Sequence, residues 1–151
     1  HNGYIAMMSG LAGGAEDILV PETHTDIDEL IKVLESGKRR GKNSMIVVVA
    51  EGDDAGGAAE IAAEVAKRSS FKDMRVAVVG HLQRGGSPTA FDRILASRLG
   101  VAAVEALVAG KTGLMAGVSK GDVVLRPFTD AWEVPSKFDP KLVDLMKLLA
   151  E

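Results

Sequence analysis

Residues 76–88 read Val76-Ala77-Val78-Val79-Gly80-His81-Leu82-Gln83-Arg84-Gly85-Gly86-Ser87-Pro88. The opening apolar run is long enough only for a buried strand, which would end at Gly80. Pro88 allows a helix to begin, and helical spacing follows from Thr89 to Leu99. The polar residues therefore fall between the carboxyl end of a strand and the start of a helix, the edge at which open α/β sheets bind ligands.

The side chains of this loop suit recognition of a phosphorylated small molecule that is rich in hydroxyl groups. Arg84 offers a planar guanidinium that can hold two phosphate oxygens, and His81 can donate to a phosphate or a hydroxyl near neutral pH. Gly85 and Gly86 would let the backbone approach a ligand. The same residues are also consistent with a Gly-rich turn that carries a solvated Arg84 and a capping Ser87, and spacing alone does not separate the two interpretations.

Hydrophobic periodicity predicts strands and helices that alternate along the first half of the chain. The strands are Asp17–Val20, Met45–Val49 and Met74–Val79, and the helices between them run from Thr25 or Asp26 to Ser36 and from Ala55 to Ser69. Such units form right-handed crossovers in a parallel sheet. The chain is therefore predicted to be an α/β protein, a Rossmann-like three-layer sandwich with a parallel central sheet.

The remaining segments predict further helices and one hairpin. They are a weak helix over Asn2–Ala12, a long helix over Ala90–Val108, a hairpin over Gly113–Val118 and Asp122–Leu125, a helical turn over Phe128–Trp132 and a final helix over Pro140–Leu149. The hairpin is expected to turn at Ser119-Lys120-Gly121.

Composition limits the class of protein. The chain has 151 residues, a one-domain length, and 46% of them are hydrophobic, which is enough for a core. A net charge of −3 argues against binding nucleic acid through a basic surface. The sequence has no Cys, which excludes disulfides and is compatible with a reducing cytosol. No apolar run reaches about 18 residues and no secretory signal is visible, so no membrane span is expected.

Two further polar segments have a structural and a functional interpretation. The basic window Lys38-Arg39-Arg40-Gly41-Lys42 follows a helix, where it could be a solvated turn that meets the negative end of the helix dipole, or an anion site. Glu51 follows the Met45–Val49 strand and could begin the next helix or accept hydrogen bonds from a ligand. Asp53 and Asp54 have no His at ligand spacing and are interpreted as helix caps, so no metal site is predicted.

The segment Val79–Pro88, followed by Asp92-Arg93 and by Ala96-Ser97-Arg98-Leu99-Gly100, resembles the sugar-phosphate loop and the next helix of 6-phosphofructokinases. The resemblance covers nearly the whole chain but only about the C-terminal half of the family's basic unit. It implies that residues 1–151 form a fructose 6-phosphate-binding C-terminal domain and that the nucleotide-binding half lies upstream. It also favours a fragment as the reason why the chain opens at His1 without a Met.

The resemblance implies a substrate site. Glu51 would accept hydrogen bonds from sugar hydroxyls, and His81 and Arg84 would belong to the loop that holds the sugar phosphate. Arg75 would reach the sugar phosphate of a neighbouring subunit, which implies a homo-oligomer, either a dimer or a tetramer.

The resemblance also implies an effector site. Glu16, Arg40 and Lys42 match the positions at which the family binds a nucleotide diphosphate or phosphoenolpyruvate. Asn43 departs from the bacterial pattern, which often has another Lys there. We therefore expect regulation by an effector on the basis of three residues that match the family pattern, with a mismatch at the fourth position, Asn43.

The implied activity converts fructose 6-phosphate and ATP to fructose 1,6-bisphosphate and ADP, a cytoplasmic step of glycolysis. The catalytic Asp, the Gly-rich phosphate loop and the Asp that serves Mg²⁺ are expected upstream of residue 1. This chain would then supply no catalytic residue, bind no cofactor and be inactive alone. A pyrophosphate-dependent enzyme and a non-catalytic regulatory half that binds a phosphosugar are the alternatives, and retention of Glu51, His81 and Arg84 disfavours the second.

Overall fold

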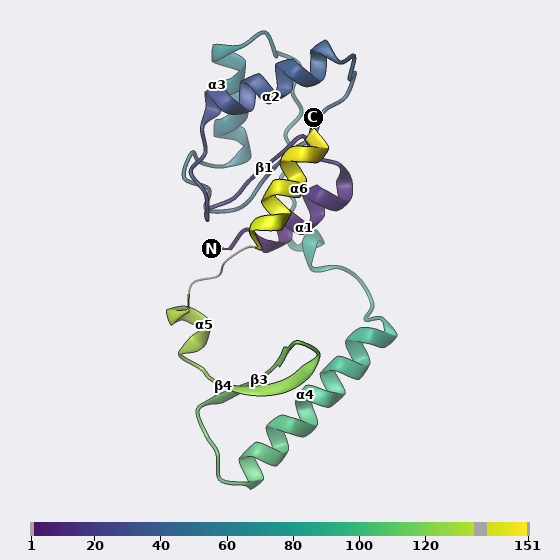
Figure 1. The fold of residues 1–151 in the computed structure, drawn as a ribbon, viewed down its shortest axis with the longest axis vertical. Helices are drawn as coiled ribbons and strands as arrows, with labels where there is room; N and C mark the ends of the chain where they lie inside the picture. Colours follow the sequence, from purple (N-terminus) through teal and green to yellow (C-terminus); the bar gives the residue numbers. More distant parts are fainter. Residues whose placement is uncertain (1, 135–138, 151) are drawn as a thin grey trace. The chain divides into compact units, whose positions relative to one another are not determined.

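The computed structural model describes residues 2–134 and 139–150, and their contacts divide the chain into two compact units. The first unit comprises His1–Val79 and Ser136–Glu151, and the second comprises Gly80–Pro135 (Figure 1). The chain leaves the first unit after Val79 and its last helix belongs to that unit again. The prediction of one domain, which rests on length, stays a prediction.

Both units combine helices with a two-stranded sheet. The first contains α1 (Tyr4–Gly13), β1 (Asp17–Leu19), α2 (Ile27–Arg39), β2 (Val47–Val49), α3 (Ala58–Arg68) and α6 (Pro140–Ala150). The second contains the 3₁₀ turn η1 (His81–Arg84), α4 (Ala90–Val108), β3 (Leu114–Ser119), β4 (Asp122–Pro127) and the single turn α5 (Asp130–Glu133). The α/β class is confirmed, and none of the described helices is long and apolar enough to cross a membrane.

The parallel pairing of β1 with β2 organises the first unit. Asp17 lies opposite Val47 and Leu19 opposite Val49, so the first two predicted strands are confirmed as parallel neighbours. The pairing extends one residue past the end of β2, because the amide of Ala50 donates to the carbonyl of Leu19, the last residue of β1, over 2.8 Å. The segments that follow the two strands therefore start side by side.

The third predicted strand, Met74–Val79, is wrong for this structure. Residues 71–80 have no regular secondary structure, and Val78 is 86% exposed. A β-branched run forms a strand only where a neighbouring edge receives its backbone hydrogen bonds and other side chains cover its faces. Within the described residues no strand pairs with this run, so the sheet of the first unit has two strands. Met74 packs against a buried hydrophobic cluster, but Val76, Val78 and Val79 are exposed.

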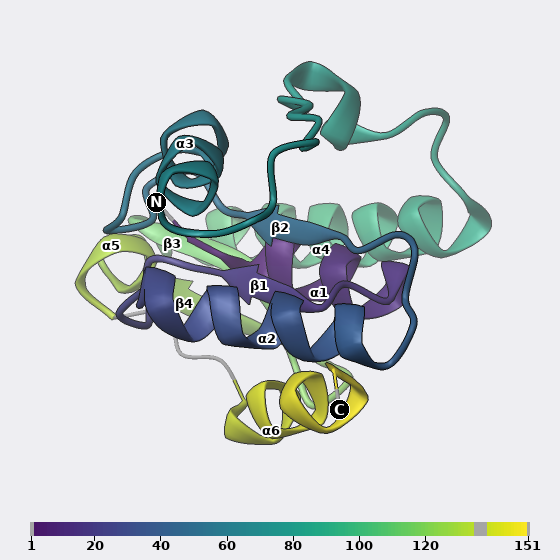
Figure 2. The same ribbon diagram turned by 90° about the horizontal axis from the view of Figure 1, so that it is seen from above.

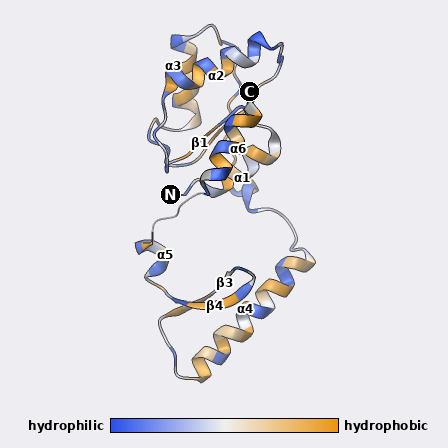
Figure 3. Ribbon diagram, in the orientation of Figure 1, coloured by the Kyte–Doolittle hydropathy of each residue, from blue (hydrophilic) through white to orange (hydrophobic). Residues whose placement is uncertain are grey.

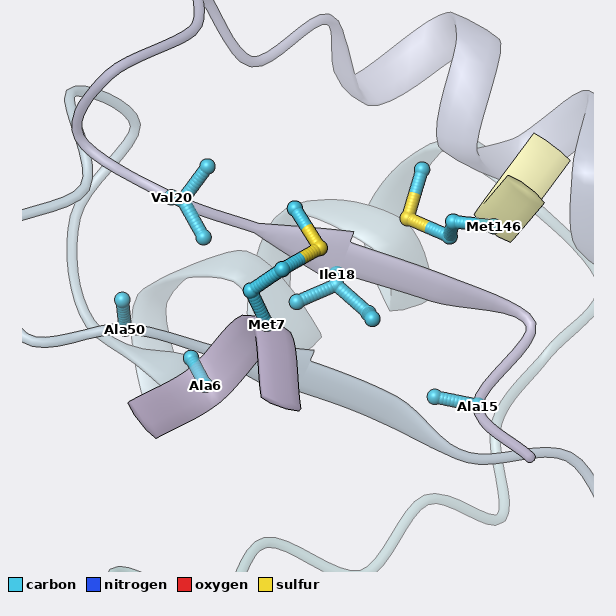
Figure 4. Packing of buried hydrophobic residues seen from close by; sticks show 7 residues of the cluster. All are labelled: Ala6, Met7, Ala15, Ile18, Val20, Ala50 and Met146. Atoms are coloured by element: carbon cyan, nitrogen blue, oxygen red, sulfur yellow. The ribbon is translucent and has the colours of Figure 1, made fainter. Parts of the chain in front are cut away.

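Two hydrophobic clusters cover the two faces of the β1–β2 pair. Ile18 belongs to a cluster formed by residues of α1, β1 and α6 and of the segments that flank the two strands, which Figure 4 shows from close by. Its buried members are Ala6, Met7, Ala15, Ile18, Val20, Ala50 and Met146. Leu19 points to the opposite face, as strand alternation requires, and packs with residues of α2 and α3: Leu30, Leu34, Ile61 and Val65. Figure 2 views this unit from the side of α2 and α3.

Local sequence signals explain where two of the helices start. Asp26 caps α2, because its side chain accepts from the amides of Asp28 over 2.8 Å and Glu29 over 3.3 Å. Thr89 and Asp92 form a capping box at the start of α4, in which the Asp92 carboxylate accepts from the Thr89 amide over 2.7 Å. Asp92, a residue of the motif after the loop, therefore has a structural role here.

The second unit contains the predicted hairpin. β3 and β4 pair antiparallel, with Ser119 opposite Asp122, and the two residues between them, Lys120 and Gly121, both have positive φ angles (53° and 91°). Positive φ at both positions is the signature of a type I′ turn, which matches the twist of the flanking strands. The predicted hairpin is confirmed.

A close approach of α1 to β1 requires glycine at position 10. A Cβ atom on Gly10 would lie 2.6 Å from the side chain of buried Ile18. We predict that Gly10→Ala lowers the free energy of unfolding by about 1–3 kcal/mol, because Ile18 must shift within a packed core. Gly13→Ala is the matched control, since a Cβ on Gly13 meets nothing within 4 Å. Urea unfolding of the 151-residue chain measures both, and equal stability of the two variants would contradict the packing.

Candidate functional site

The segments that follow β1 and β2 are joined by side-chain hydrogen bonds. The Thr25 hydroxyl donates to Asp53 Oδ2 over 2.8 Å in a buried contact, and the Thr25 amide donates to Asp54 Oδ1 over 3.0 Å. His24 Nδ1 lies 2.5 Å from Asp54 Oδ2. Asp53 and Asp54 were predicted to cap the next helix, and this is wrong, because α3 begins at Ala58 with Gly57 at its N-cap. The acidic pair instead fastens the two segments to each other.

Glu51 lies in an exposed turn directly after β2, as predicted. The amide of Asp53 donates to the carbonyl of Ala50 over 3.3 Å, which closes the turn around Glu51 and Gly52. Gly52 has a φ of +92°, the left-handed conformation that the third position of a type II turn requires. Glu51 therefore occupies the carboxyl edge of the parallel pair, although its role as a substrate contact stays a prediction.

His81 and Arg84 lie in the second unit, in η1, and both are exposed. In a 3₁₀ helix, side chains three residues apart lie above one another, so the imidazole and the guanidinium share one face of this turn. Gly85 follows with a φ of +90° and ends the turn. The turn thus places its two candidate phosphate ligands on one face, and their binding of an anion stays a prediction.

Arg75 lies in the first unit, exposed, in the segment without regular structure. Glu51 and Arg75 thus belong to one unit, and His81 and Arg84 to the other. The four residues predicted to contact the substrate are therefore divided between the two units, and their role stays a prediction.

The three predicted effector residues gather at the opposite, amino end of the β1–β2 pair. Glu16 is only 5% exposed and accepts from Lys42 Nζ over 3.0 Å and from the amide of Ile46 over 2.6 Å. Arg40 Nη1 donates to the Ser36 hydroxyl over 2.7 Å. The basic window is therefore partly a structural element, because Lys42 neutralises a buried carboxylate that precedes β1.

A cavity of about 380 Å³ lies beside these residues, bounded by β1, α2 and α6. Glu16, Ser36 and Arg40 line it together with Asp17 and Lys147, which sequence reasoning missed. Burial raises the pKa of the Asp17 carboxyl above its usual range. The sequence indicated a cavity residue at Asp17 only by placing a carboxylate at the start of an apolar run. It gave no such indication for Lys147, because α6 is more than 100 residues from β1 along the chain.

Electrostatics at the carboxyl edge are dominated by the His24–Asp54 pair. The hydrogen bond and negative charge of Asp54 raise the pKa of His24 above 6.5, and Asp26 and Asp53 act in the same direction. The same contact lowers the pKa of Asp54 below 3.8. Both side chains are exposed, and within the described residues no group of three or more His, Cys, Asp or Glu could hold a metal ion.

The family model for phosphofructokinase matches residues 1–107, a range that includes every site residue predicted from the sequence. The chain belongs to the phosphofructokinase family. It is 53% identical over 150 residues to ATP-dependent 6-phosphofructokinase 1 of Thermus thermophilus, covering 99% of this chain and 46% of that protein. It is 44% identical over 149 residues to the ATP-dependent 6-phosphofructokinase of Clostridium acetobutylicum, with coverage of 99% and 46%. This phosphofructokinase chain thus spans about half the length of the curated relatives it matches.

Solved phosphofructokinases share its fold. Pichia pastoris phosphofructokinase in the T-state superposes with a TM-score of 0.72 at 30% identity, over 99% of this chain and 16% of that one. Phosphofructokinase from Saccharomyces cerevisiae gives a TM-score of 0.79 at 24% identity, over 99% of this chain and 24% of that one. The resemblance inferred from the loop sequence is confirmed at the level of the family.

The His24–Asp54 pair of this phosphofructokinase gives a test of the geometry at the carboxyl edge. The pair stabilises the fold between the usual pKa of Asp54 near 3.8 and that of His24 near 6.5. This contribution is lost as the pH rises through the raised pKa of His24, and as it falls through the lowered pKa of Asp54. We predict that Asp54→Asn returns the His24 pKa toward 6.5, measured by NMR titration of the imidazole. Asp73→Asn, which changes an exposed carboxylate elsewhere, should leave it unchanged. An identical His24 pKa in wild type and Asp54→Asn would contradict the contact.

Proposed function

We propose that this chain is the sugar-phosphate-binding half of an ATP-dependent 6-phosphofructokinase. The enzyme would transfer a phosphoryl group from ATP to fructose 6-phosphate, giving ADP and fructose 1,6-bisphosphate in cytoplasmic glycolysis. One observation carries the proposal. This chain, a member of the phosphofructokinase family, has Glu51 at the carboxyl edge of β2 and has His81 and Arg84 on one face of η1. A carboxylate for hydroxyl groups and a cationic pair for a phosphate are what a phosphosugar requires.

The proposed roles follow from the chemistry of each side chain. Arg84 holds two phosphate oxygens through its planar fork, and His81 donates to the same phosphate. Glu51 accepts hydrogen bonds from sugar hydroxyls, because an ionised carboxylate is an acceptor only. Arg75 reaches the sugar phosphate of a neighbouring subunit in a homodimer or homotetramer. Its exposed position in a segment without regular secondary structure is compatible with this role.

The phosphoryl donor and Mg²⁺ belong to the half of the enzyme that this chain does not contain. The named relatives are ATP-dependent, which favours ATP over pyrophosphate as the donor. A regulatory role for the effector set Glu16, Arg40 and Lys42 is part of the same proposal, with an anionic effector beside the buried Glu16–Lys42 pair.

The uncovered apolar surface of the second unit supports the proposal that a further half completes the fold. The apolar residues of α4 do not gather along one stripe, and Figure 3 shows hydrophobic colour along much of this helix. Phe91 is 73% exposed and Val108 is also exposed. A helix that is hydrophobic all round is normally buried. In the complete enzyme, residues 1–151 would form the C-terminal domain of a Rossmann-like three-layer sandwich, and the run 76–79 would join its parallel sheet.

The isolated chain provides a direct test. We predict no turnover when the 151 residues are assayed with ATP, Mg²⁺ and fructose 6-phosphate, because the base and the donor site are supplied from elsewhere. The full-length protein, assayed in parallel, is the positive control. Measurable turnover by the isolated chain would show that the catalytic parts had been misplaced.

Arg84→Ala in the full-length enzyme tests the phosphate site. Loss of a charge-assisted bidentate partner should raise the KM for fructose 6-phosphate about tenfold or more, with little change in the KM for ATP. Arg98→Ala is the matched control, because the Arg98 guanidinium donates to the carbonyl of Gly121 over 2.9 Å and has no proposed contact with substrate. An unchanged KM in Arg84→Ala would remove this residue from the site.

A further inference from the structure

The turn that carries Glu51 has little intrinsic rigidity. Glu51 is exposed, its neighbour Gly52 has no side chain to pack, and one backbone hydrogen bond of 3.3 Å closes the turn. A carboxylate that must meet particular hydroxyl groups needs to be held within about 0.5 Å of its productive position. Something other than the turn itself must therefore fix Glu51.

The contact between Asp53 and Thr25 has the properties of such a support. Both residues are 7% exposed, and their 2.8 Å hydrogen bond is buried. The second oxygen of Asp53 accepts from the amide of Ala55 over 3.0 Å, so one carboxylate bridges the segment after β1 and the segment after β2. Asp53 is also the residue whose amide closes the turn around Glu51. Fixing the Asp53 side chain thus fixes one end of that turn.

The other end of the turn is fixed by the sheet. The Ala50 amide donates to the Leu19 carbonyl over 2.8 Å, and Ala50 itself is buried. Glu51 and Gly52 are then held between two anchored residues, one in the β1–β2 ladder and one in the hydrogen bond to Thr25. Removing the second anchor would leave that end held only by the contacts of Asp54 with the Thr25 amide and with His24, which are less buried.

We propose that Thr25 and Asp53 are positioning residues, which hold the Glu51 carboxylate at the carboxyl edge of β2 so that it can accept hydrogen bonds from the sugar. This inference rests on the proposed function, because it gives Glu51 a substrate to receive. The neighbouring His24–Asp54 contact lies on the same two segments but is exposed, so it is a weaker tie than the buried one.

A double-mutant cycle in the full-length enzyme tests the inference. Thr25→Val has nearly the same shape but no hydroxyl, and it should raise the KM for fructose 6-phosphate about threefold to tenfold with a nearly unchanged kcat. Thr25→Ser keeps the hydroxyl and should restore the wild-type KM. In a Glu51→Gln background, Thr25→Val should raise the KM by less than about twofold, because its effect passes through Glu51. Glu35→Gln, an exposed carboxylate of α2, is the control for the loss of charge.

The outcomes separate the inference from a merely structural role. A structural role would lower stability and raise the KM by the same factor in the wild-type and Glu51→Gln backgrounds, and that result would overturn the inference. Asp53→Asn, which keeps one acceptor oxygen, gives a second variant should Thr25→Val fail to fold, and the same cycle applies to it. A raised KM in Glu51→Gln with an unchanged KM in Thr25→Val overturns the positioning role alone. An unchanged KM in Glu51→Gln overturns both the positioning role and the proposed contact of Glu51 with the sugar.

Discussion

The parallel pairing of β1 with β2 is the constraint on which the first unit depends. Three residue pairs and the continuing hydrogen bond from Ala50 to Leu19 set the two chain segments side by side. Because neighbouring residues of a strand face opposite ways, Ile18 and Leu19 bury two separate clusters and attach helices to both faces of the pair. Loss of this pairing would remove the core of the unit and separate the segments that carry the candidate site.

The same pairing separates two kinds of chemistry. At its carboxyl edge, exposed Glu51 stands on a turn braced by the Thr25–Asp53 contact, which leaves a carboxylate available to a ligand. At its amino end, the Glu16 carboxylate is buried and already satisfied by Lys42 and the Ile46 amide. A substrate is proposed at the first end and an effector at the second. An effector would have to exchange contacts with a formed ion pair, whereas the proposed sugar would find an exposed carboxylate.

Sequence patterns predicted what local interactions determine. Asp26 begins α2 as an N-cap, Lys120 and Gly121 turn the hairpin, and the apolar runs of β1 and β2 pair as expected. The run at 76–79 failed because a strand requires a partner edge, which propensity does not supply. The ties from Thr25 to Asp53 and from His24 to Asp54 were missed because they join residues 28 and 30 positions apart. The loop motif identified the family, yet it gave no information on how Glu51 is held.

The most direct test of the central claim is hydrogen–deuterium exchange of the full-length enzyme with and without saturating fructose 6-phosphate. If the sugar phosphate is held by Glu51 and by the η1 loop, amides in residues 50–55 and 80–87 should exchange more slowly when the ligand is present. The basic window at residues 38–42 should exchange at the same rate in both conditions. Exchange rates in residues 50–55 and 80–87 that are the same with and without fructose 6-phosphate would contradict the account.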